Sequence, residues 1–277
     1  GEAAYYYTFA GYVDGWPQTW DDAVSPIITV RACDGFKVLG LAELNETFTA
    51  ELAGARINNV LDSVRWTVGG TWLLGSSVDS QLGTTTILGP TGGRAISEGD
   101  STVMTQTLVN ANALQYVNDV ADSEYGLLYV DGSGSVVFRN RHYLFGVVSL
   151  DVIGDAPDEG GYSDFALDYD DQHIFNDVRM CRIDGEPQAA SDTDSQLTYF
   201  KRTLQNDRLL LTTDAEVAAR ANYLLLRYKD PHWRSRGLTL GGSRSWSTML
   251  ILEIGDRITV TRRPQGGTAI TTQFRIE

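Results

Sequence analysis

The sequence is poor in cysteine, with only two among its 277 residues. Cys33 and Cys181 are too far apart to form a metal-binding motif, and two cysteines do not make a disulfide framework. We therefore expect two free, buried thiols, and we expect neither a metal nor a cofactor.

The sequence also lacks a long apolar run. No stretch of about 18 apolar residues is present, and no secretory signal pattern is visible, so we expect no membrane span. The chain begins with Gly1 instead of Met, opens in a strand-like run at 5–9 and ends in another at 272–277. These ends suggest an excerpt from a longer protein.

Basic residues are scarce as well. The chain holds 22 Lys and Arg against 36 Asp and Glu, for a net charge of -14. This balance disfavours binding of nucleic acid through a general basic surface. Hydrophobic residues make up 42%, and six Trp with thirteen Tyr supply large core side chains, which argues against disorder.

The charge is unevenly spread along the chain. Segment 151–194 has thirteen acidic residues and two arginines, a net charge of -11, whereas segment 227–277 has nine basic and four acidic residues, a net charge of +5. Two such parts could face each other within one chain or between copies. The alternative interpretation of the acidic segment is a solvated loop.

The pattern of apolar residues predicts strands at both ends of the chain and helices in between. The turn Asp131-Gly132-Ser133-Gly134 predicts a hairpin, and Thr213 with Glu216 has the spacing of a capping box. The mixture indicates an α+β fold. Helices are predicted at 56–66, 106–124 and 213–230, and strands at 5–13, 27–33, 127–130, 136–138, 175–183, 196–203, 208–211, 237–240, 257–262 and 269–276.

Motifs of common catalytic sites are missing. The sequence has no Gly-x-Ser-x-Gly, no His-Glu-x-x-His and no phosphate-binding glycine loop. Gly99-Asp100-Ser101 matches the nucleophile block of one esterase class, but a match of three residues is a weak signal, and a serine nucleophile needs a histidine within hydrogen-bond reach. We predict no catalytic residue, although a carboxylate pair for glycoside cleavage stays open because its spacing is spatial.

Two polar clusters have simple structural interpretations. The segment 168–173 gathers three carboxylates and an imidazole, but it lacks the glycine and distal glutamate of a calcium loop, so we expect no metal there. Trp233 lies beside Arg234 and Arg236 in a small basic and aromatic cluster that could touch nucleic acid. We interpret Trp233 instead as a core residue at the start of a strand.

Several segments, taken in order, carry a resemblance to a known family. The chain resembles the minor tail proteins, or tail hubs, of long-tailed bacteriophages of GC-rich hosts. The matching segments are FAGYVDGWPQTWD at 9–21, VRACDGFK at 30–37, ALQYVNDVADSE at 113–124 with LYVDGSG at 128–134 and FR at 138–139, FNDV at 175–178 and LEIGDRITV at 252–260.

The resemblance implies a virion protein without catalytic activity. Three copies would form a ring at the distal end of the tail, joining the tail tube, the distal tail protein and the tape measure protein to tip or fibre proteins. DNA would pass through the lumen. The implied fold has β-barrel-like tube domains at 1–50 and 164–277 around a helix and hairpin domain at 51–163. The motif positions interpreted as packing and turn residues are Trp16, Pro17, Trp20, Gly35 and Gly255.

An acidic lumen would repel the phosphates of passing DNA. We therefore expect Asp164, Asp168, Asp170 and Asp171 to lie on a lumen face or an inter-subunit face. Two alternatives stay open. One is a cell-wall or polysaccharide hydrolase domain of the tail tip, and the other is a carbohydrate-binding module that uses exposed aromatics such as Trp233 or Trp246.

Overall fold

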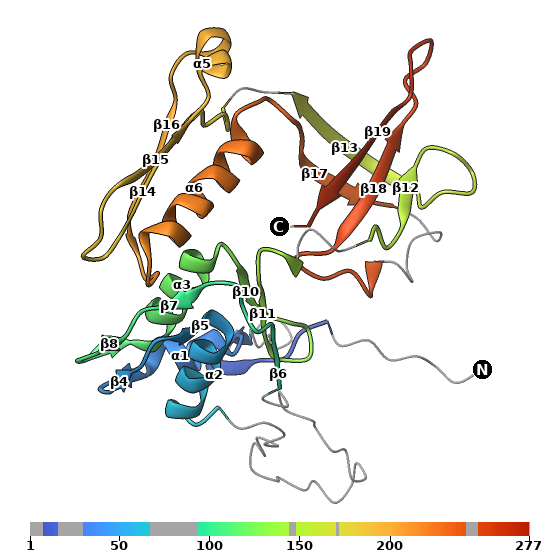
Figure 1. The fold of residues 1–277 in the computed structure, drawn as a ribbon. Helices are drawn as coiled ribbons and strands as arrows, with labels where there is room; N and C mark the ends of the chain where they lie inside the picture. Colours follow the sequence, from blue (N-terminus) through green and yellow to red (C-terminus); the bar gives the residue numbers. More distant parts are fainter. Residues whose placement is uncertain are drawn as a thin grey trace, which may run out of the picture.

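The computed structural model describes residues 8–15, 30–66, 93–143, 148–169, 172–241 and 249–276. Within these residues five helices accompany several small sheets, which confirms the predicted mixed α+β class. Figure 1 shows three groups: a helical body below, a sheet with one long helix at the upper left, and paired sheets at the upper right. None of the helices described is long and apolar enough to cross a membrane.

The helical body packs α2 against α3, with α1 alongside α3. Helix α2 buries Ile57, Val60 and Leu61, three positions of its predicted apolar stripe. Burial of each such side chain contributes about 1.5–3 kcal/mol. The helices are α1 (Phe36–Leu41), α2 (Ala53–Ser63) and α3 (Ala113–Glu124).

Helix α3 begins later than predicted. The expected helix at 106–124 is wrong in its first seven residues, where two short strands lie and where Val109 is exposed. The start is set by Asn112, whose side-chain oxygen accepts a hydrogen bond from the Gln115 N–H at 3.0 Å. An Asn at this position satisfies an end N–H of the helix, so the helix starts there.

Short antiparallel ladders tie the chain before α2 to the chain before α3. They pair β3 (Glu43–Leu44) with β9 (Ala111–Asn112), β4 (Thr47–Phe48) with β8 (Gln106–Thr107), and β5 (Glu51–Leu52) with β7 (Thr102–Val103). Near the N-terminus β1 (Tyr12–Gly15) pairs with β2 (Arg31–Cys33).

The predicted hairpin is confirmed. Strand β10 (Leu127–Val130) pairs antiparallel with β11 (Val136–Arg139), which also runs parallel to β6 (Arg94–Ile96). Asp131 accepts hydrogen bonds from the N–H groups of Ser133 and Ser135, both at 2.9 Å. The turn chemistry of the sequence therefore forms as expected.

The second group is a three-stranded sheet covered by α6 (Asp214–Tyr228). Strand β14 (Asp177–Arg182) lies between β15 (Gln188–Ser191), which is antiparallel, and β16 (Thr203–Leu209), which is parallel. Helix α6 packs on β14 and β15 (Figure 1). The predicted capping box of Thr213 and Glu216 is present.

One predicted strand in this group is wrong. The sequence predicts a strand at 196–203, but the first half of this segment belongs to α5 (Thr193–Tyr199). Asp192 accepts a hydrogen bond from the Ser195 N–H at 2.9 Å and so caps the helix, and the strand β16 begins only at Thr203.

The third group consists of two sheets that share a core. One sheet has the order β12 (Val152–Gly154), β18 (Arg257–Arg262) and β19 (Ile270–Arg275), and the other pairs β13 (Tyr162–Tyr169) with β17 (Trp233–Leu240). Ile153, Ile258 and Val260 form the buried centre, with aromatic side chains such as Phe165 and Phe274 packed against it.

Closed tube-type barrels were expected but are not found in the described residues. No sheet there has more than three strands, and the third group is an open pair of sheets. The reason lies in the pairing: β13 and β17 hydrogen-bond only to each other among the described strands, so the two sheets meet through side chains. The expected domain boundaries stay a prediction.

Candidate assembly surfaces

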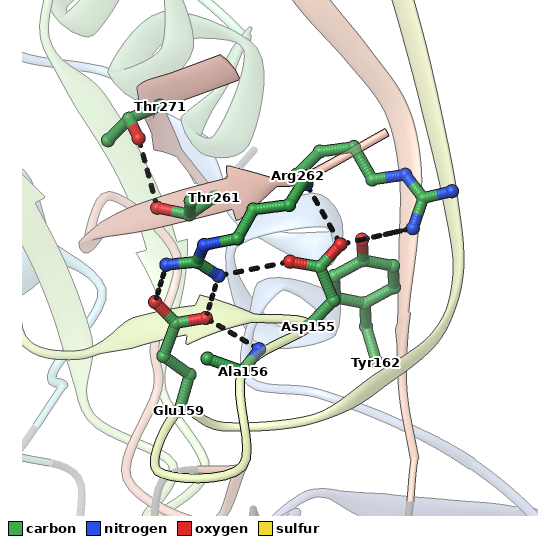
Figure 2. A network of polar contacts seen from close by, with 8 residues as sticks. Asp155, Ala156, Glu159, Tyr162, Thr261, Arg262 and Thr271 are labelled. Atoms are coloured by element: carbon green, nitrogen blue, oxygen red, sulfur yellow. Dashed lines mark hydrogen bonds and ion pairs between the residues drawn. The ribbon is translucent and has the colours of Figure 1, made fainter. Parts of the chain in front are cut away.

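The acidic and basic parts of the chain meet in the loop between β12 and β13 (Figure 2). Arg263 forms a two-pronged contact with Glu159, at 2.7 and 2.6 Å, and a third bond with Asp155 at 3.0 Å. Asp155 also accepts from Arg262 at 3.2 Å. The backbone N–H of Arg263 also donates to Asp155, at 2.8 Å. The backbone bond and the guanidinium bonds favour the ionised carboxylates, so Arg263 lowers the pKa of both Asp155 and Glu159 below the usual values.

Two further ion pairs join the same parts of the chain. Asp168 on β13 lies 2.7 Å from Arg236 on β17, and Asp192 lies 2.8 Å from Lys229 at the end of α6. The hydrogen bond from Lys229 lowers the pKa of Asp192. Several acidic residues of segment 151–194 thus pair with basic residues of segment 227–277 within one chain.

The predicted acidic face is only partly within the described residues. Asp164 and Asp168 lie on the same face of β13, since side chains alternate along a strand, and Phe165 lies on the opposite face. Asp164 is exposed, whereas Asp168 is half-buried beside Arg236. Asp170 and Asp171 lie outside the described residues. The placement of these residues on a lumen face stays a prediction.

Two of the glycines from the matching motifs occupy restricted positions. A Cβ atom at Gly35 would lie 2.3 Å from a ring carbon of the buried Trp66. Gly255 has a φ of 94° and donates its N–H to the Ile276 carbonyl at 2.9 Å. The other three motif residues, Trp16, Pro17 and Trp20, lie outside the described residues.

The segment Gly99-Asp100-Ser101, which matches the esterase block, is held in place by hydrogen bonds to other parts of the chain. Ser101 is buried, and its hydroxyl accepts a hydrogen bond from Arg141 at 2.9 Å. Its N–H donates to Glu124 at 2.7 Å, and burial raises the pKa of that carboxyl. The nearby His142 contacts Asp100, at 2.8 Å. A buried serine held by an arginine has no approach for a substrate, which argues against a nucleophile.

Two expectations about single side chains are wrong. Cys33 is exposed and Cys181 is half-buried, so the two free thiols are not buried. Trp233 is 43% exposed, and its ring lies 4.9 Å from that of Tyr169, the residue opposite it in the ladder, with the two ring planes tilted by 52°. Trp233 lies outside the core because it is the first residue of β17 and pairs with Tyr169, the last residue of β13, at the edge of the ladder.

In the described residues no group of three potential ligands could hold a metal.

A cleft of about 760 Å³ lies between α6, β17 and β19. The ring of Tyr228 has the guanidinium groups of Arg227 and Arg234 at 5.6 and 5.9 Å. Trp233 and Phe274 add aromatic walls, and no Asp or Glu is among the described lining residues. The sequence pointed to Trp233 and Arg234, but not to the cleft, because its walls come from elements far apart in the chain.

A pair of smaller clefts contains carboxylates. Asp131 and Glu253 line both, and Asp256 lines the second; their volumes are about 310 and 300 Å³. Burial raises the pKa of Glu253, and the charges of Asp131 and Asp256 add to that rise. Glu253 and Asp131 therefore form a pair of carboxylates in which one pKa is raised, as in an acid and base pair of an enzyme.

Comparisons with known proteins identify the fold. No protein-family model and no curated protein matches the sequence. The 43 kDa tail protein of prophage MuSo2 from Shewanella oneidensis is similar in structure, with a TM-score of 0.58 and 14% identity, over 95% of this chain and 73% of that chain. A tail protein from Neisseria meningitidis MC58 has a TM-score of 0.58 and 10% identity, over 97% and 73%. This chain has a tail-protein fold.

The tail-protein fold extends over nearly the whole chain. Because the similarity covers 95% and 97% of the residues, it includes the helical body, the sheet with α6 and the paired sheets. The resemblance inferred from the sequence motifs is confirmed at the level of the fold.

Proposed function

We propose that this chain is a structural protein of a phage tail that forms a homotrimeric ring, the tail hub, at the distal end. The observation that carries the proposal is the fold shared with two tail proteins over nearly the whole chain. The order of the sequence motifs supports the more specific assignment to a hub of a long-tailed phage. The ring acts without catalysis.

In this proposal the ring joins the tail tube, the distal tail protein and the tape measure protein to the tip or fibre proteins. DNA passes through its lumen during infection. The exposed Asp164 and the net charge of -14 support a passage that repels phosphates. Asp168, Asp170 and Asp171 continue the same acidic segment, on a lumen or inter-subunit face.

Cryo-electron microscopy of tails that contain this chain tests the proposal. We expect density for the chain on the tail axis, at the distal end, with three-fold symmetry and with Asp164 toward the lumen or a neighbouring copy. A position on a lateral fibre would contradict the hub, and Asp164 on the outer surface would contradict the acidic lumen.

A charge reversal tests the lumen separately. Asp164→Lys is expected to leave tail assembly intact and to slow DNA release, because a cation in the passage attracts phosphates. The control is Glu46→Lys, which reverses an exposed acid in the helical body. Equal release by both variants would refute the acidic lumen.

A second candidate is a polysaccharide hydrolase, which the raised pKa of Glu253 beside Asp131 favours. A general acid for glycoside cleavage has these properties. Zymography on host cell walls decides the matter: a lysis zone that Glu253→Gln abolishes would replace the structural role, and no zone would leave it standing.

A third candidate is a carbohydrate-binding module. The exposed rings of Trp233 and Tyr169, 4.9 Å apart and tilted, could form an aromatic surface for a sugar ring. Binding to a glycan array that Trp233→Ala abolishes would support this function over the hub.

A further inference from the structure

Helix α5 lies at the outer end of the β14–β16 group (Figure 1). Its residue Leu197 and its C-cap residue Phe200 are large and apolar. Leu197 and Phe200 are each 80% exposed. We call this pair the knob. Two large apolar side chains, three positions apart in the chain and with so little cover, indicate a contact surface.

The backbone of Phe200 is unusual. Its φ is 61° and its ψ is 165°, a conformation that is essentially reserved for glycine. A bulky residue adopts it only where the surrounding structure imposes it. The knob thus combines an exposed aromatic ring with a strained backbone, and such strain clusters at binding sites.

The conformation is imposed by the buried side chain of Asn176. Its amide donates to the Phe200 carbonyl at 2.8 Å and to the Ser195 hydroxyl at 3.1 Å. Its side-chain oxygen accepts from the Arg202 N–H at 2.9 Å. Asn176 therefore fixes the chain on both sides of Phe200 and leaves its side chain exposed.

The cleft between α6, β17 and β19 has the complementary character. It is about 760 Å³ in volume, which is room for two large side chains, and Trp233 and Phe274 are among its walls. Arg227 and Arg234 make it cationic, while the knob has the exposed Asp194 in the first turn of its helix. Apolar and charged groups thus match between the two surfaces.

We propose that the knob of one copy inserts into the cleft of a second copy of this chain. The two surfaces are different parts of the molecule, so the contact is head-to-tail. Repetition of such a contact closes into a ring if the rotation between copies permits. The inference rests on the proposed ring and assigns the surfaces that hold it together.

Removal of the Phe200 ring is the first test, made on the purified protein by size-exclusion chromatography with light scattering. Phe200→Gly deletes the ring and relieves the positive φ, so we expect the melting temperature to stay equal or rise. We expect association to weaken at least about 30-fold, as for a central interface residue. A wild-type monomer at micromolar concentration, or unchanged association of the variant, overturns the proposal.

Leu41→Ser is the matched control. Leu41 is 78% exposed in the helical body, away from the knob and the cleft. We expect this variant to associate as the wild type does. An equal loss of association in both variants would show a general effect of apolar surface and would overturn the knob.

Complementation tests the head-to-tail geometry. Trp233→Glu alters the cleft and places an acid where Asp194 of the other copy would dock. We expect each variant alone to be monomeric and an equimolar mixture of Phe200→Gly and Trp233→Glu to form a 1:1 dimer, since one intact knob still meets one intact cleft. A mixture that stays monomeric overturns the pairing.

These results are separable from the proposed function. Tail reconstructions report whether the chain is a hub, and the solution experiments report which surfaces join the copies. A chain found on the tail axis whose Phe200→Gly variant still associates would keep the hub and reject the knob.

Discussion

The buried Arg56 provides the sharpest test of how the helical body is held together. Its side chain is 0% exposed and lies within α2. Nε donates to Glu51 at 2.6 Å, Nη2 donates to the Thr49 carbonyl at 2.5 Å and the Met104 carbonyl at 3.1 Å, and Nη1 donates to the Tyr116 hydroxyl. One guanidinium therefore connects α2 with β5, with the chain between the short strands at Thr49 and Met104, and with α3.

The substitution Arg56→Met keeps an unbranched stem and removes these bonds. The carboxylate of Glu51, whose side chain is 18% exposed, then loses its counter-ion. The buried Tyr116 hydroxyl and the carbonyls of Thr49 and Met104 lose a donor. Removal of one partner from a buried ion pair costs about 3–5 kcal/mol. For a chain of this size that free energy corresponds to a melting temperature lower by about 6–15 °C.

Urea denaturation followed by circular dichroism measures the loss. The control is Arg179→Met, which removes an arginine with 54% side-chain exposure that pairs with Asp177 at 3.0 Å, and which should cost about 1 kcal/mol or less. Adding Glu51→Gln to Arg56→Met should recover part of the loss, because the unpaired charge is gone. A cost below about 1 kcal/mol for Arg56→Met would refute the central role of this network.

Three further predictions concern other parts of the fold. Gly35→Ala should destabilise the protein by about 1–3 kcal/mol in a thermal melt, because its Cβ would contact Trp66; an unchanged melt would contradict that packing. Thr213→Ala should cost about 1 kcal/mol in urea through loss of the helix cap. The folded-state pKa of Glu159 is depressed by Arg263, so its stabilisation is present above the ordinary value of 4.5 and disappears as the pH falls through the folded pKa. Glu159→Gln should therefore lower the melting temperature at pH 7 and have no effect once the pH lies below the folded pKa.

Features that depend on neighbouring residues could be predicted from the sequence. The capping box of Thr213, the turn after Val130 and the paired strands at 257–262 and 270–275 follow from contacts within a few residues. Local chemistry decides such elements whatever the rest of the chain does. The α+β class, the hairpin and α6 are thus determined by the sequence itself.

The errors occur where distant residues decide the outcome. Segment 196–203 has a strand-like composition, but Asp192 caps a helix there and the buried Asn176, from the start of the sheet, fixes the chain after it. Trp233 is apolar enough for a core, yet its position as the first residue of β17 leaves it exposed. Composition describes a preference, and packing overrides it.

The candidate surfaces likewise depend partly on the sequence alone and partly on contacts between distant residues. The sequence by itself determined that the chain carries an acidic segment and a basic C-terminal part, because charge is a property of the residues alone. Only the tertiary structure decided that Arg263 binds Asp155 and Glu159, more than 100 residues away in the chain. The cleft beside Tyr228 likewise exists only when α6, β17 and β19 come together, since no one of these elements has all its walls.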